Sequence, residues 1–155
     1  MRMIGFVGGW ALSVAASLAT GCASAPPATE VAGTVQAAAN VNPSVSKRPS
    51  PLLLRVYALK TATAFNAADF VSLYQQDQTV LGADLLGREE MILKPGDSRP
   101  MTTVNSPDAR FIGVFAAYRD LDHATWRSVL PVQPGRKQRV AIRAEELSIN
   151  LGISK

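Results

Sequence analysis

The chain has 155 residues, a formal net charge of +4, 18% charged residues and a single cysteine. Once an N-terminal signal is removed, this length suffices for one domain and is too short for two domains with separate cores. One cysteine excludes an internal disulfide, and basic residues that are scattered without interleaved aromatics are not typical of a nucleic-acid-binding protein.

The N-terminal segment is typical of a lipoprotein signal peptide. Arg2 precedes an uncharged run over residues 4–19, which is about as long as a signal-peptide core and shorter than the roughly 20 apolar residues of a membrane span. The run ends in LATGC, residues 18–22, which resembles the lipobox of bacterial lipoproteins, with the leucine one place further from the cysteine than usual. An uncleaved anchor or a plain secretory signal would leave the lone cysteine unexplained. We therefore expect residues 1–21 to be removed and Cys22 to be lipidated.

A lipid anchor has consequences for where the rest of the chain lies. Two or more acyl chains make membrane attachment effectively permanent. In the lipoprotein class an Asp after the cysteine favours the inner membrane, and Ala23 stands there instead, which implies the outer membrane with the domain in the periplasm. Residues 22–32 are rich in Ala, Pro, Ser and Thr and predict a flexible tether. Residues 33–155 would then form the folded domain.

Short β-prone runs at roughly ten-residue spacing follow the tether and favour a β-sandwich. The run over 109–119 is apolar on both parities, which predicts a central strand covered on both sides, and Pro131 places its neighbour near an edge. The last two runs alternate polar and apolar residues, as a half-buried antiparallel pair does. In chain order the expected strands are residues 33–41 (the weakest), 52–60, 88–97 (closed by a Pro-Gly turn), 109–119, 126–132, 139–144 and 147–151.

One segment, FNAADFVSLYQQ, has helical rather than strand periodicity. Its apolar residues at helical spacing are Ala67, Phe70, Val71 and Tyr74. Asn66 is placed to cap the first amides with Asp69 at N3, and Phe65 can pack onto Phe70 as a staple. The pattern predicts a helix of two to three turns that covers one end of the sandwich core, in preference to a membrane or cofactor role.

Residues that could carry chemistry are few and do not converge. His123 lies in a polar turn between Asp120 and Asp122, where a calcium loop is conceivable but would need more oxygen ligands. The adjacent pairs Glu89-Glu90 and Glu145-Glu146 point to opposite faces of a strand, whereas paired acid and base carboxylates must converge. No phosphate-binding glycine loop, G-x-S-x-G or H-E-x-x-H is present in the sequence. The chain therefore reads as a binding or structural protein, not an enzyme, with no cofactor or metal site.

Three stretches together, LRVYALKTATAFNAADFVSLYQQDQTVLGADLLGREEMILKPGD, FIGVFAAYRD and WRSVLPV, resemble the TssJ lipoproteins of the bacterial type VI secretion system, over residues 52–151. The resemblance implies a mostly β, transthyretin-like β-sandwich of two antiparallel four-stranded sheets with one short helical insertion. It also implies an outer-membrane lipoprotein that faces the periplasm, binds the periplasmic C-terminal region of TssM and has no small-molecule substrate. The alternative is a periplasmic lipoprotein enzyme or small-ligand carrier on the same sandwich. A buried polar cluster in a pocket would favour it, and none is visible in the sequence.

The segment between the first two expected strands, NPSVSKRPSP, is the candidate partner-binding loop. Its three prolines limit backbone freedom, and Lys47 and Arg48 offer a positive tip. A simple solvated connection would have the same composition. In the TssJ family, however, the loop between the first two strands is implicated in contact with TssM, so we expect this loop to be the main partner-binding element, steered toward an acidic surface. Its residues are Asn42, Pro43, Ser44, Val45, Ser46, Lys47, Arg48, Pro49, Ser50 and Pro51.

Overall fold

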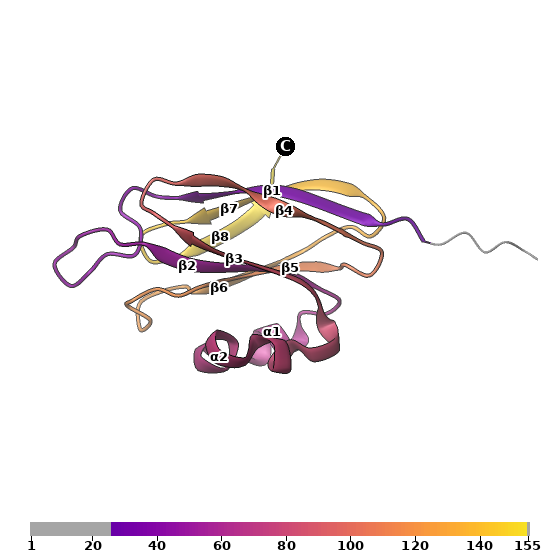
Figure 1. Cartoon of the computed structure of the whole chain (residues 1–155), viewed down its shortest axis with the longest axis horizontal. Coiled ribbons are helices and arrows are strands. Elements are labelled where there is room, and N and C mark those ends of the chain that lie inside the picture. Colours follow the sequence, from indigo (N-terminus) through magenta and orange to yellow (C-terminus); the bar gives the residue numbers. More distant parts are fainter. Residues whose placement is uncertain (1–25, 155) are drawn as a thin grey trace, which may run out of the picture.

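The computed structural model describes residues 26–154 as a sandwich of two β-sheets with helices packed on one of them (Figure 1). The expected signal peptide and Cys22 lie outside the described residues. Within the described residues, no helix is both long enough and apolar enough to cross a membrane. The elements are β1 Thr29–Ala37, β2 Leu52–Leu59, α1 Thr63–Ala67, α2 Phe70–Leu81, the 3-10 helix η1 Gly82–Asp84, β3 Leu85–Leu93, β4 Ser98–Ser106, β5 Phe111–Ala116, β6 Arg127–Pro131, β7 Lys137–Ala144 and β8 Ile149–Ile153.

Both sheets have four strands, which confirms the predicted sandwich. The first sheet has the order β4-β1-β7-β8 and the second the order β3-β2-β5-β6. In the first sheet β1 and β7 are parallel, whereas the other pairs in both sheets are antiparallel. The expectation of two purely antiparallel sheets is therefore wrong for the first sheet. Between β1 and β7 the chain crosses to the second sheet twice: it returns to the first sheet as β4, antiparallel to β1, and then as β7, parallel to β1.

The domain begins earlier than the sequence predicts. Residues 29–32 were expected in the tether, but Thr29 and Val31 are completely buried and belong to β1. The strand ends at Ala37 and not at residue 41 as expected. Local composition missed this start because the strand is stabilised by ladders to β4 and β7 on either side, not by an apolar pattern of its own.

Strand β4 has no counterpart among the expected strands. Its sequence, SRPMTTVNS, is mostly polar and contains Pro100, and only Met101 is fully buried. Because β4 lies at the edge of the first sheet, a proline that cannot donate to a ladder is tolerated there. A strand that buries one side chain leaves almost no periodic signal in the sequence.

The predicted central strand is confirmed as β5, which contributes to two cores. Ile112 and Val114 lie in the core between the sheets, whereas Phe115 points to the other face, beneath the helices. Strand β6 pairs with β5 as predicted and forms an edge, with Pro131 at its end. The antiparallel pair β7 and β8, strand β2, and the Pro-Gly turn after β3 are also confirmed.

The helical segment is divided into α1 and α2, and its capping differs from the expectation. Ala68 is extended (ψ 144°) between them, so Asp69, not Asn66, is the N-cap of α2. The Asp69 carboxylate accepts hydrogen bonds from the Ser72 amide at 2.9 Å and the Ser72 hydroxyl at 2.7 Å. These bonds lower the pKa of Asp69. As Figure 1 shows, the two helices cover the outer face of the second sheet.

Candidate functional site

Four connections lie at one end of the sandwich, opposite the end at which β1 begins (Figure 1). One is the β3–β4 turn over residues 94–97, whose Gly96 amide donates to the Ala38 carbonyl at 3.2 Å. The other three are the β1–β2 loop over residues 38–51, the β5–β6 connection over 117–126 and the β7–β8 turn over 145–148. We call this region the loop end. It contains the whole of the predicted partner-binding segment.

Asn42 joins the β1–β2 loop to the β5–β6 connection and to the β7–β8 turn. Its side-chain Nδ2 donates to the Pro51 carbonyl at 2.8 Å, and its Oδ1 accepts from the Arg119 amide at 2.9 Å. Its own amide donates to the Glu146 carbonyl at 3.0 Å. Asn42 is only 2% exposed, and its φ of 50° lies in the left-handed region, where Asn is enriched. Asn42 is one of the predicted contact residues, but the structure gives it a positioning role.

The tip of the β1–β2 loop is closed by its own hydrogen bonds. The Ser44 amide donates to the Arg48 carbonyl and the Lys47 amide to the Ser44 carbonyl, both at 2.8 Å. The Arg48 amide donates to Ser44 Oγ at 3.3 Å, and Lys47 has a φ of 60°. Residues 44–48 therefore form a closed turn, so the loop is organised by backbone hydrogen bonds as well as by its prolines.

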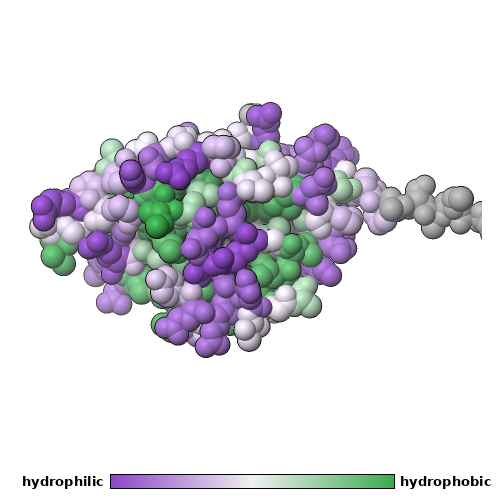
Figure 2. All heavy atoms as spheres, viewed as in Figure 1, coloured by the Kyte–Doolittle hydropathy of each residue, from purple (hydrophilic) through white to green (hydrophobic). Residues whose placement is uncertain are grey.

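The surface of this tip is both apolar and basic. Val45 is fully exposed (105%), and Lys47 and Arg48 are exposed beside it. Figure 2 shows hydrophobic and hydrophilic residues together at the far end of this loop. The sequence points to the basic pair more clearly than to Val45, whose only signal is a β-branched apolar residue between two serines. Of the remaining predicted residues, Ser46, Pro49 and Pro51 are exposed, Pro43 and Ser44 are half-buried and Ser50 is buried.

A groove of about 550 Å³ separates the β1–β2 loop from the β5–β6 connection. It is lined by Pro43, Ser44, Val45, Lys47, Arg119, Asp120 and Leu147. The loop end also carries carboxylates, so it is not uniformly positive: the cations Lys47, Arg48 and Arg119 lie among Asp120, Asp122, Glu145 and Glu146.

His123 lies in the exposed turn that the sequence predicts. Its Nδ1 is 2.8 Å from Asp120 Oδ1, and this hydrogen bond and the carboxylate charge raise the pKa of the imidazole. Among residues 26–154, no group of three or more His, Cys, Asp or Glu side chains is arranged to hold a metal ion.

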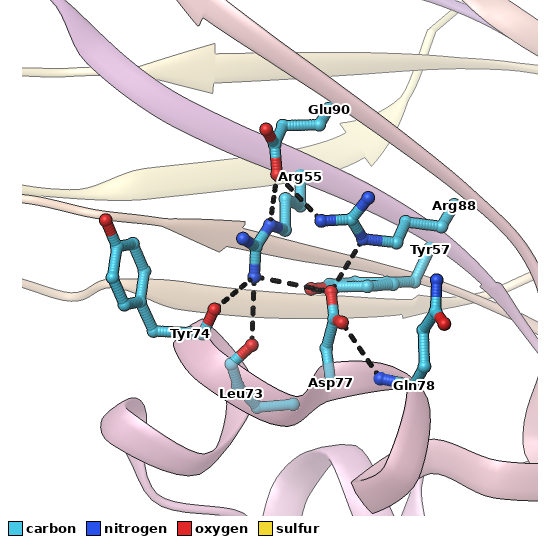
Figure 3. Close-up of polar contacts among 8 residues, drawn as sticks. All are labelled: Arg55, Tyr57, Leu73, Tyr74, Asp77, Gln78, Arg88 and Glu90. Atoms are coloured by element: carbon cyan, nitrogen blue, oxygen red, sulfur yellow. Dashed lines mark hydrogen bonds and ion pairs between the residues drawn. The ribbon is translucent and has the colours of Figure 1, made fainter.

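A second polar feature, which is not apparent from the sequence, lies beneath α2 (Figure 3). We call Arg55, Tyr57, Asp77, Arg88 and Glu90 the ionic cluster, of which Arg55, Tyr57 and Asp77 are buried. Asp77 Oδ2 accepts from the Tyr57 hydroxyl at 2.8 Å and from Arg88 Nε at 2.7 Å. Arg55 Nε donates to Glu90 at 2.7 Å. In the part of the chain that the structure describes, every buried side-chain nitrogen and oxygen has a hydrogen-bond partner.

The cluster holds α2 to the second sheet. Arg55 Nη1 donates to the main-chain carbonyls of Leu73 and Tyr74, at 3.0 and 2.9 Å. These carbonyls precede Gln76, whose φ of −139° breaks the helix, and the Asp77 carboxylate caps the next turn through the Gln78 amide at 2.8 Å. Arg55 therefore binds carbonyls at a kink and fixes the position of α2.

The protonation of the cluster does not suit acid–base catalysis near neutral pH. Burial raises the pKa of the Tyr57 hydroxyl, and its hydrogen bond to Asp77 raises it further. Burial acts to raise the pKa of Asp77, but hydrogen bonds from Tyr57 and Arg88 and the nearby positive charges outweigh it, and the net shift is downward. Near neutral pH Tyr57 is therefore protonated and Asp77 charged, and the hydrogen bond between them joins β2 to α2.

Comparison with known proteins decides the family. The family described as "Type VI secretion lipoprotein, VasD, EvfM, TssJ, VC_A0113" matches residues 29–147. The chain belongs to this TssJ family. The match confirms the resemblance found in the sequence and extends it to the start of β1.

Solved structures share the fold of this TssJ-family chain. It is 39% identical to the T6SS lipoprotein TssJ1 from Pseudomonas aeruginosa, with a TM-score of 0.79 over 83% of this chain and 98% of that one. Serratia marcescens Lip, a membrane bound component of the Type VI Secretion System, is 30% identical, with a TM-score of 0.73 over 81% and 98%. A chain in the structure of the T6SS protein TssM C-terminal domain (869-1107) from EAEC is 27% identical, with a TM-score of 0.66 over 79% and 99%. No curated protein sequence matches the chain.

Membership fixes the general class of the protein. The TssJ family comprises type VI secretion lipoproteins and is not a family of enzymes. Membership therefore supports attachment to a membrane through lipid and a role in the type VI secretion membrane complex.

Proposed function

We propose that the chain is an outer-membrane lipoprotein that faces the periplasm, binds the periplasmic C-terminal region of TssM and fastens the type VI membrane complex to the outer membrane. The acyl chains on Cys22 provide the anchor, and Ala23 after the cysteine permits transfer to the outer membrane. The β1–β2 loop provides the main contact with TssM. The occurrence of a chain 27% identical to this one in a TssM C-terminal domain structure supports the choice of partner.

The anchor is tested by Cys22→Ser. Because acyl chains contribute nearly all the membrane affinity of such a protein, the variant should leave the outer-membrane fraction while its domain stays folded. Fractionation of cells that express the variant measures this directly. Continued tight association with the outer membrane contradicts the proposed anchor.

The observation that supports the proposed contact is that Val45 is fully exposed on a closed turn, which the hydrogen bonds of Asn42 hold in place. An apolar side chain held in water gains about 1.5 to 3 kcal/mol when a partner buries it. The hydrogen bonds within residues 44–48 and those of the Asn42 side chain, which we call the Asn42 latch, fix this turn before binding. Little conformational entropy is therefore lost on docking. The loop is therefore built to present an apolar anchor flanked by cations.

The contact is tested by replacing residues 43–49 with Gly and Ser while Asn42 and Ser50 are kept. Binding to the periplasmic region of TssM, measured by calorimetry, should be lost, and the circular dichroism and the unfolding midpoint should change little. If this variant binds as tightly as the parent, the interface lies elsewhere.

A single substitution sharpens this test. Val45→Asp should weaken binding at least tenfold, because about 1.4 kcal/mol of lost burial corresponds to that factor. Val71→Asp is the matched control, since Val71 is also an exposed valine (56%) but lies on α2. Equal losses for the two variants would contradict a contact through Val45.

A further inference from the structure

A second groove lies at the opposite end of the sandwich, where the chain enters the domain. Because β1 and β7 are parallel, both begin at this end, and Glu30 is paired in register with Lys137. The Gly135 amide donates to Thr29 Oγ1 at 3.0 Å, which holds the β6–β7 turn beside the start of β1. The segment that leads back to Cys22 therefore leaves the domain next to this turn.

The groove has a volume of about 570 Å³, and we call it the tether-end groove. It is lined by Glu30, Ala32, Gln133, Lys137, Gln138, Arg139, Ile153 and Ser154.

Positive charge exceeds negative charge around this groove. Lys137 Nζ pairs with Glu30 Oε2 at 2.9 Å. Arg139 in the groove and the adjacent Arg136 are exposed and form no ion pair with any residue in the range 26–154. Ile153 is 56% exposed at the rim. The groove thus combines the unpaired guanidinium group of Arg139 with an apolar side chain, and the guanidinium group of Arg136 lies next to it in sequence.

We propose that the tether-end groove docks on anionic phospholipid headgroups of the membrane that carries the anchor. This inference rests on lipidation of Cys22. Fully extended, the chain from Cys22 to Thr29 spans at most about 25 Å, so the groove is held close to the headgroups. Such confinement makes docking an intramolecular event with a high effective concentration, so a few charges suffice.

The chemistry of the groove selects this partner over a protein surface. Arginine guanidinium groups pair with phosphate in a fixed fork geometry, and Ile153 can enter the boundary between headgroups and acyl chains. At the loop end, by contrast, the cations lie among carboxylates, which a negatively charged bilayer would repel. Docking through the tether-end groove would point the loop end away from the membrane, toward a periplasmic partner (Figure 1).

The test uses the lipoprotein purified from membranes and reconstituted into phosphatidylethanolamine vesicles with or without phosphatidylglycerol. Lipidation alkylates Cys22, so one introduced cysteine is the only free thiol. Gln133→Cys places a fluorophore at the tether-end groove, and Ser46→Cys places the same fluorophore at the loop end as a control. Quenching by a lipid with a nitroxide headgroup reports which end lies near the bilayer.

We expect strong quenching of the label at position 133 with phosphatidylglycerol and little at position 46. Arg136→Glu with Arg139→Glu should lower the ratio of docked to undocked protein roughly 30-fold or more, from about fivefold per cation removed. Salt of about 1 M should have a similar effect, because it shortens the screening length to about 3 Å. Lys94→Glu with Arg143→Glu, the same charge change away from this groove, should leave the quenching unchanged.

Quenching at position 133 that is independent of phosphatidylglycerol, or unchanged by the Arg136 and Arg139 substitutions, overturns the proposal. Labelling of two thiols in place of one would show that Cys22 is unmodified, which is a failure of the anchor. The groove is then judged with a Cys22→Ser chain that carries a histidine tag in front of residue 22 and is held on the vesicles by a nickel-chelating lipid, which restores a tether. Arg136→Glu with Arg139→Glu must reduce the phosphatidylglycerol-dependent quenching at position 133 there too, and equal quenching also overturns the proposal.

Discussion

The loop end and the helix side of the sandwich both contain clusters of charged residues. Those at the loop end are exposed to water, whereas Arg55 and Asp77 on the helix side are buried. At the loop end Lys47 and Arg48 are in water, and Asn42 is the buried group that holds the loop in place. Beneath α2 the side chains of Arg55 and Asp77 are each only 9% exposed and have several partners. Buried charges affect stability strongly when a partner is removed, whereas exposed charges contribute little to stability and remain available to a partner molecule.

Phe115→Ala should have the largest effect on stability. The substitution changes only the core on the helix side and leaves the loop end intact. The Phe115 ring is fully buried and packs on Phe70 and Trp126, with ring centres 5.0 and 5.7 Å away. We expect a loss of about 3 to 5 kcal/mol of unfolding free energy, because the cavity cannot close between sheet and helix. Denaturant unfolding measures the loss, and a change below about 1 kcal/mol would contradict this packing.

Asp77→Ala should be nearly as severe. It removes the acceptor of Tyr57 and Arg88 and leaves Arg55 with less compensation. We expect a loss of about 3 kcal/mol, near the lower end for a broken buried ion pair, since Arg88 can still reach water. Glu90→Gln is the control, because its side chain is 39% exposed, and it should cost clearly less in the same denaturant experiment. Equal losses would mean that the buried carboxylate of Asp77 contributes no more to stability than the exposed carboxylate of Glu90.

Asn42→Ala tests whether a buried polar residue holds the β1–β2 loop in position. The substitution leaves the Arg119 amide and the Pro51 carbonyl without their side-chain partner and removes a residue suited to positive φ. We expect a loss of about 2 kcal/mol, within the range for buried groups left unsatisfied. Binding to TssM should weaken too, because the loop loses its fixed position. Calorimetry and thermal unfolding on the same sample separate these effects, and unchanged binding would show that the latch does not organise the interface.

The pH dependence of stability should come partly from the helix side. The folded-state pKa of Asp77 is lowered below its value in the unfolded chain, about 3.9. Its contribution is therefore fully present above that unfolded value and is lost as pH falls through the lower, folded pKa. Asp77→Asn should flatten this part of the acid unfolding curve. An unaltered slope below pH about 4 would assign the acid sensitivity to other carboxylates.

Lys47→Glu with Arg48→Glu should have the smallest effect on stability. Both side chains are exposed, so the unfolding midpoint should stay within experimental error. Association with TssM should become slower and its salt dependence should reverse, since rim charges act mainly on the association rate. Stopped-flow mixing at several salt concentrations measures the association rate. An unaltered rate would show that Lys47 and Arg48 do not steer association.

Much of the fold was predictable because the side chains themselves encode it. The run that became β5 is apolar on both parities because it contacts two cores, and β7 and β8 alternate because one face meets water. The expected loop is also where the sequence places it, because prolines and serines exclude a regular strand. These signals depend only on neighbours in the sequence.

Only the tertiary structure decided the start of β1 at Thr29, the polar edge strand β4 and the parallel pairing of β1 with β7. Each depends on partner strands that are distant in the sequence. Arg55 and Asp77 are far apart along the chain and reveal their pairing only once α2 lies on β2. Val45 likewise becomes a candidate anchor only because the closed turn holds it in water. Local patterns record which side chains must be buried, whereas long-range pairing selects the polar groups that meet and the apolar groups that stay exposed.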